Sequence, residues 1–206
     1  NKQWVTELQE KAGDLPMVFE NSYRRAPMYE FYSGIPAISL NNYMYRKNQY
    51  SIDVSEERVR GKKILYVTPY REGGDITYTT LDGSVFHGFF MDNFQSYRRL
   101  QCIVKKPKTG TVHELKVVNP YPFDVPLQQL KFTISYSNAY KQVKQMLPLK
   151  VKGNGLRGSL LKSKDTVHYN FELPLPTIEN PVYFRIGISE NGLLPGLNGK
   201  PIKIVE

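Results

Sequence analysis

The feature that most constrains the fold is a shared change in charge and hydrophobic pattern near residue 85. Of the 28 Lys and Arg and the 19 Asp and Glu residues, 11 of each lie at or before Phe90. The other 17 basic and 8 acidic residues follow, so the net charge of +9 lies in the second part. Mixed helical and strand patterns give way there to apolar–polar alternation. We therefore expect an α+β chain of two modules, residues 1–88 and residues 89–206.

The first module alternates helical and strand patterns. Gln3–Lys11 has its apolar residues on one helical face, and Met28, Phe31 and Tyr32 have helical spacing after Pro27. Gly13 and Gly34 follow these segments as stop signals. Three runs have the length of buried strands, and a further helix could precede the third: Leu15–Phe19, Ala37–Leu40 and Lys63–Thr68. This order predicts a small α/β layer with parallel strands, a Rossmann-like arrangement.

The second module has seven segments in which apolar and polar residues alternate, separated by turn residues. About seven short strands in ~115 residues are typical of an immunoglobulin-like antiparallel β-sandwich. Pro148 places its segment at the edge of a sheet, because proline cannot donate to the strand ladder. Cys102 is the only cysteine and alternates with Leu100 and Val104, which predicts a small core residue and excludes an internal disulfide.

Polar residues follow the predicted strands of the first module. Ligands of parallel sheets gather beyond the carboxyl ends of the strands. Arginine offers a donor fork that suits phosphate or carboxylate, while Asn and Gln can pair with sugar hydroxyls. The alternative interpretation is a solvated loop whose polar groups cap helix ends. The candidate binding residues are Tyr23, Arg24, Arg25, Arg46, Asn48, Gln49 and Tyr50.

The sequence contains no complete catalytic constellation. His87, His113 and His168 lie in separate segments without ligand spacing, so we expect exposed histidines and no metal site. Gly73-Gly74 is a turn pair rather than a glycine-rich phosphate loop, and we expect no cofactor.

The lysines of the second module allow two interpretations. Scattered lysines on strands and turns serve solubility and protect sheet edges. They could instead hold the module close to anionic lipid headgroups or an anionic glycan. Nucleic acid is not an expected partner, because the strand aromatics share the apolar face with Leu and Ile.

Four segments carry a family resemblance: Leu15–Tyr23, Tyr29–Gly34, Ser39–Asn42 and Arg46–Tyr50. Over roughly residues 10–70, the chain resembles the soluble C-terminal part of bacterial polytopic glycosyltransferases related to protein O-mannosyltransferases and the lipid A aminoarabinose transferase. The resemblance implies a region that follows the last transmembrane helix on the periplasmic side of the bacterial inner membrane. The parent protein would transfer a sugar from a polyprenyl-phosphate carrier to an acceptor. The catalytic acid of that family lies in an early periplasmic loop outside these residues, so no catalytic residue is carried over.

The leading functional hypothesis is therefore a non-catalytic region of a membrane glycosyltransferase that assists acceptor or membrane docking. Its partners would be the polyprenyl-phosphate-linked sugar or a glycan acceptor, and an anionic membrane surface. The start at Asn1 and the lack of an apolar run of about 20 residues predict an excised piece or a processed product. The alternatives are a structural interaction domain or a periplasmic or surface carbohydrate-binding protein, with Tyr121, Phe123 and Tyr140 as its aromatic platform.

Overall fold

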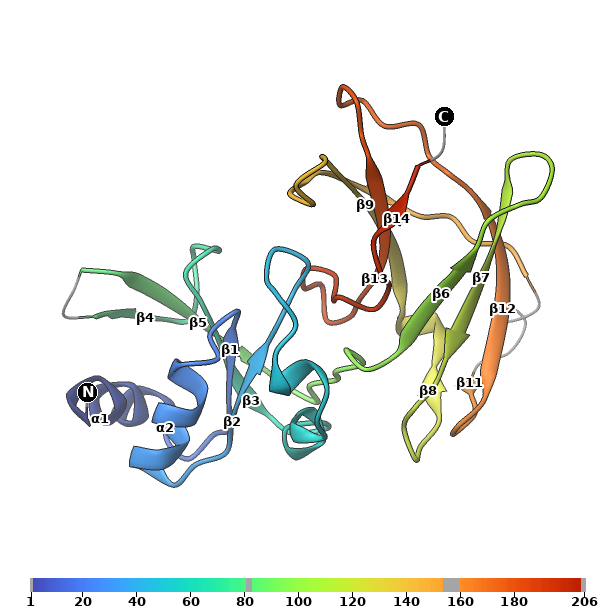
Figure 1. Cartoon of the computed structure of the whole chain (residues 1–206). Coiled ribbons are helices and arrows are strands. Elements are labelled where there is room, and N and C mark those ends of the chain that lie inside the picture. Colours follow the sequence, from blue (N-terminus) through green and yellow to red (C-terminus); the bar gives the residue numbers. More distant parts are fainter. Residues whose placement is uncertain (1, 81–82, 154–159, 205–206) are drawn as a thin grey trace. The chain divides into compact units, whose positions relative to one another are not determined.

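The computed structural model describes residues 2–80, 83–153 and 160–204, and most of its regular structure is β (Figure 1). The chain forms two compact units, Asn1–Ser96 and Tyr97–Glu206. The boundary falls after Ser96 rather than after residue 88, because strand β5 (Val85–Met91) pairs with the sheet of the first unit. Neither of the described helices has the length and apolar character that crossing a bilayer requires.

The first unit contains a five-stranded sheet, called the mixed sheet. Strand β1 is central among the parallel strands and pairs with β2 and β3 on either side, while β5 is antiparallel to β3 and β4. The expected parallel layer is therefore present in three strands only. The order is β2 (Ala37–Leu40), β1 (Met17–Glu20), β3 (Ile64–Thr68), β5 and β4 (Ile76–Thr79).

The antiparallel half of the mixed sheet arises from the hairpin of β4 and β5 that follows β3 in the chain. Strand β4 runs in the same direction as β3, and the chain reverses between β4 and β5, so that β5 lies between them and is antiparallel to both. Gly88 permits close packing there, since a Cβ atom at that position would meet the Ile76 side chain at 2.6 Å. A hairpin needs no long crossover, which is why the sheet changes direction at this point.

Two helices pack on the mixed sheet through an aromatic cluster. Helix α1 (Lys2–Ala12) and helix α2 (Arg25–Ser33) confirm the two predicted helices. The Trp4 ring lies 6.2 Å from both Phe19 and Tyr29, and these two rings are 5.9 Å apart. Helix α2 ends at Gly34, whose φ of 73° lets its N–H donate to the Glu30 carbonyl at 2.9 Å.

The connection between β2 and β3 contains short 3₁₀ turns instead of the further α-helix considered above. They are η1 (Gln49–Ser51) and η2 (Ser55–Arg58). Asn48 caps η1, because its side-chain oxygen accepts the Tyr50 N–H at 3.1 Å. Ser96 fixes the segment beyond β5 by donating to the buried Glu56 carboxylate at 2.6 Å.

The second unit is built from antiparallel sheets. A four-stranded sheet and a three-stranded sheet share one hydrophobic core, which contains Ile134 and Phe184 from the first and Leu115 and Tyr169 from the second. This arrangement is compatible with a β-sandwich. The four-stranded sheet consists of β10 (Val143–Pro148), β9 (Lys131–Ser137), β13 (Tyr183–Ser189) and β14 (Ile202–Lys203). The three-stranded sheet consists of β12 (Thr166–Glu172), β7 (Val112–Val118) and β6 (Gln101–Lys105), and β8 (Val125–Pro126) pairs with β11 (Leu160–Leu161).

Two residues of the second unit confirm predictions made from the alternation. Strand β10 is an edge strand, as Pro148 predicted. Cys102 is a buried free thiol, and burial raises its pKa to about 12. His113 contradicts the expectation of an exposed side chain, because it is buried and stacks on Phe171 with 5.2 Å between ring centroids.

A buried polar cluster joins the start of the second unit to the segment after β13. The guanidinium of Arg98 lies 3.1 Å from the Glu190 carboxylate, and both side chains are at most 5 % exposed. Asn198 donates to the Leu100 carbonyl at 3.0 Å and accepts the Ile188 N–H at 2.8 Å. The ion pair compensates both buried charges within the unit, which gives the cluster a structural role.

Candidate functional site

The carboxyl ends of β1, β2 and β3 meet at one edge of the mixed sheet, which we call the carboxyl edge (Figure 1). The chain passes from β1 to β2 on one side and then returns across β1 to reach β3. The direction of strand addition therefore reverses between β1 and β3. In open α/β sheets such a reversal is the place where ligands bind.

Glu20 occupies the centre of the carboxyl edge. It is the last residue of β1, is only 6 % exposed, and pairs in register with Leu40 of β2. Its carboxylate accepts a hydrogen bond from the Asn42 side-chain amide at 2.5 Å and another from the Thr68 hydroxyl. No Lys or Arg in the described parts of the chain forms an ion pair with it. A carboxylate in this position is thus held by neutral donors alone.

The loops beyond β1 and β2 are tied to each other by asparagines. Asn21 donates from its side chain to the Asn42 side-chain oxygen at 2.9 Å, and it accepts the Asn42 N–H at 2.9 Å. Asn21 has a φ of 50°, a left-handed conformation that asparagine tolerates better than most residues. Burial, and next the charge of Glu20, raise the pKa of the Tyr43 hydroxyl, which places Tyr43 near the same carboxylate.

A second layer of hydrogen bonds extends from the end of β2 into η1. Ser39 donates to the Asn41 side-chain oxygen at 3.0 Å, and Asn41 donates to Asn48 at 2.7 Å and to Ser51 at 2.9 Å. The side-chain nitrogen of Asn48 is buried and has no hydrogen-bond partner among the described residues. It is therefore a donor that a ligand or a water molecule could satisfy at this edge.

The structure brings together two of the predicted binding residues from different segments. The guanidinium carbon of Arg46 lies 6.0 Å from the centre of the Tyr23 ring, which is 40 % exposed. Arg24, next to Tyr23, and Gln49, at the start of η1, are also exposed. Arg46 and Tyr23 thus form a cationic and aromatic rim beside the hydrogen-bonded floor of the carboxyl edge.

Two other predicted binding residues make contacts that stabilise the unit. The Arg25 guanidinium lies 4.2 Å from the centre of the Phe86 ring on β5. Tyr50 is buried, and burial followed by the charges of Glu30 and Asp53 raises the pKa of its hydroxyl. Their binding roles stay predictions, as do those of the other five residues.

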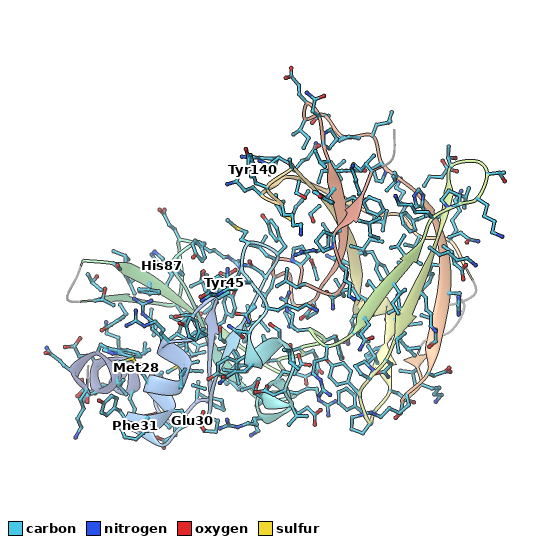
Figure 2. The ribbon with its side chains drawn as sticks, in the orientation of Figure 1. Met28, Glu30, Phe31, Tyr45, His87 and Tyr140 are labelled. Carbon is cyan, nitrogen blue, oxygen red and sulfur yellow. The ribbon has the colours of Figure 1, made fainter. Side chains whose placement is uncertain are left out.

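Sequence reasoning missed Glu20, Thr68 and His87. Glu20 directly follows the apolar run Leu15–Phe19, which was a signal that a carboxylate ends a buried strand. His87 pairs in register with Thr68, so β5 places it at the carboxyl edge, where Figure 2 labels it together with Tyr45 of the segment after β2. The Nδ1 atom of His87 is buried without a partner among the described residues.

The chemistry of the carboxyl edge suits hydroxyl groups and anions. It combines amides, a carboxylate and hydroxyls with the guanidinium of Arg46. These groups bind sugar hydroxyls and phosphate in proteins. Within residues 2–80, 83–153 and 160–204, no three His, Cys, Asp or Glu side chains gather in a way that could hold a metal ion.

No protein-family model matches the sequence, and no curated protein matches it. We therefore base the functional proposal on the sequence pattern and on the geometry of the carboxyl edge.

Proposed function

We propose that this chain is the extramembrane, non-catalytic region of a membrane glycosyltransferase that transfers a sugar from a polyprenyl-phosphate donor. The carboxyl edge would help to place the sugar-bearing substrate or the acceptor, on the periplasmic side of a bacterial inner membrane. In this proposal the first unit is a Rossmann-like layer, supported by the order β2-β1-β3. The second is an immunoglobulin-like sandwich, supported by two antiparallel sheets around one core.

The observation that carries the proposal is the position of Glu20 and its partners. Burying a carboxylate without a cation costs free energy. A protein that keeps such a carboxylate therefore has a use for it that offsets the cost. Glu20, Asn21 and Asn42 come from two of the segments that resemble the glycosyltransferase family, and Arg46 and Asn48 come from a third. Ionised carboxylates have about four acceptor sites, and protein donors occupy two of them here. Substrate hydroxyls could use the others.

The test is sugar transfer by the complete polypeptide that the gene encodes, reconstituted in vesicles with a polyprenyl-phosphate sugar. Replacing Arg46→Ala should lower transfer by about tenfold, the effect of losing one hydrogen bond to a charged group. The melting temperature should not change, because Arg46 is exposed.

Lys63→Ala is the matched control. Lys63 is also an exposed cation near an aromatic ring, 5.9 Å from the centre of Phe90, but it precedes β3 at the opposite end of the strand. The control should transfer sugar at the normal rate. If Arg46→Ala transferred sugar at the normal rate, the rim would not contact the substrate, and the proposal would be contradicted.

A carbohydrate-binding protein is the second candidate, and the observation that favours it is the 86 % exposure of Tyr140. The rest of the expected aromatic platform is not exposed, since Tyr121 is fully buried and Phe123 stacks on it at 4.8 Å. Calorimetric titration of the isolated chain with glycans tests this candidate. Binding that Tyr140→Ala abolishes would favour it over the glycosyltransferase region.

A further inference from the structure

The hairpin between β9 and β10 presents an aromatic side chain on a fixed turn (Figure 2). The Asn138 side-chain oxygen accepts the N–H groups of Tyr140 and Gln142, each at 3.0 Å. The Asn138 side-chain amide donates to the Gln142 side chain at 3.0 Å, and Lys141 adopts a φ of 61°. These bonds hold the turn in one conformation while the Tyr140 ring points away from it with 86 % exposure.

Lysines surround this end of the four-stranded sheet. Lys141 Nζ lies 5.8 Å from the centre of the Tyr183 ring, and Tyr183 pairs in register with Lys203 of β14. Lys106 lies beside Lys203, because its Nζ donates to the Lys203 carbonyl at 2.5 Å. Lys144 lies at the irregularity where the register of β10 shifts, and it is exposed. We call Tyr140 with these four lysines the hairpin end.

The charge of the hairpin end is not neutralised by the protein. None of its four lysines forms an ion pair with a carboxylate in the described part of the chain. The wider unit reinforces this charge, since Tyr97–Glu206 contains 17 Lys and Arg against 7 Asp and Glu. The hairpin end therefore attracts an anionic surface rather than a neutral one.

The side chains of the hairpin end match a lipid surface better than a sugar. Tyrosine favours the membrane–water interface, where its ring is apolar and its hydroxyl reaches water. Lysine is attracted to anionic headgroups, and each one near the surface strengthens binding about fivefold. Sugar recognition would need free amide or carboxylate groups, whereas the amides of Asn138 and Gln142 already bond to each other.

We propose that the hairpin end is a docking surface for an anionic lipid bilayer, with Tyr140 at headgroup depth and the four lysines facing the lipid phosphates. This surface belongs to the second unit and does not depend on the carboxyl edge. If the chain did not bind lipid vesicles, the result of the Arg46 experiment would still stand. Likewise, unchanged sugar transfer in Arg46→Ala would not affect the proposal for the hairpin end.

The test is co-sedimentation of the 206-residue chain with vesicles of phosphatidylcholine alone or with 30 % phosphatidylglycerol. We expect binding to the anionic vesicles only, and loss of binding at high salt. The double variant Lys141→Gln with Lys144→Gln should bind about 25-fold more weakly, at about fivefold per lysine. Tyr140→Ala should also weaken binding.

The matched control is Lys131→Gln with Lys150→Gln. Both lysines are exposed and lie at the other end of the same two strands, and the change in net charge is identical. The control should bind anionic vesicles nearly as well as the unchanged chain. An equal loss in both double variants would overturn the proposal, because attraction would then depend on total charge alone. Absence of vesicle binding, or salt-resistant binding of a neutral glycan through Tyr140, would overturn it as well.

Discussion

The two units bury a glutamate in opposite ways. In the second unit, Glu190 lies 3.1 Å from the Arg98 guanidinium, so its charge is compensated inside the protein. In the first unit, Glu20 is held by Asn42 and Thr68, and no cation in the described residues pairs with it. The same residue type is thus paired with a cation in one unit and held by neutral donors in the other, which is the basis for proposing a ligand site at Glu20 alone.

The largest effect is expected from Arg98→Ala. The change leaves Glu190 buried without its cation, and breaking a buried pair in this way costs about 3–5 kcal/mol of unfolding free energy. Urea denaturation followed by circular dichroism measures the loss, with Lys150→Ala as an exposed control. A loss below about 1 kcal/mol would mean that the pair has no structural role, and the contrast between the units would fail.

A smaller change in stability is expected from Glu20→Gln. The substitution keeps the shape of the side chain and both neutral partners, so the unfolding free energy should change by about 1 kcal/mol at most. Sugar transfer by the complete polypeptide should nevertheless fall, because the negative acceptor is lost. If stability collapsed while the remaining folded protein still transferred sugar normally, Glu20 would be structural, like Glu190.

The smallest effect concerns pH and His113. Burial lowers the pKa of His113, the nearby Lys106 charge lowers it further, and a bond to the Thr111 carbonyl partly opposes both. Because the folded pKa lies below the ordinary value of 6.5, the unfolded state binds the proton more readily. The stability from neutral His113 is therefore complete above pH 6.5 and declines as the pH falls from there through the folded pKa. Thermal melts of the wild type and His113→Phe should show a weaker decline for the variant, and identical slopes would contradict this account.

Local sequence patterns were sufficient for much of the first unit. Short apolar runs bounded by glycine, proline and polar residues predicted the three parallel strands, and Gly13 and Gly34 marked the helix ends. Strand β5 could not be assigned to this sheet, because its direction and partner depend on a hairpin with β4 rather than on its own composition. The division after Ser96 cannot be located from local composition for the same reason.

The carboxyl edge was predictable in position but not in detail. Polar residues after the strands indicated where a ligand could bind, and Tyr23 and Arg46 do lie together. The contact between Glu20 and Asn42 depends on the register of β1 against β2, which no local pattern specifies. The burial of His113, in contrast, was predictable from the sequence. His113 lies on the same face of β7 as the buried Leu115 and Val117, because side chains alternate between the two faces of a strand.

The most direct measurement compares sugar transfer by the complete polypeptide with transfer by the isolated 206-residue chain, using the same polyprenyl-phosphate sugar and acceptor. We expect transfer by the complete polypeptide and none by the isolated chain, because the proposed role of the carboxyl edge is to place the substrate and not to carry out the chemical step. Turnover by the isolated chain would show that these residues catalyse transfer themselves, and the proposed non-catalytic role would be wrong.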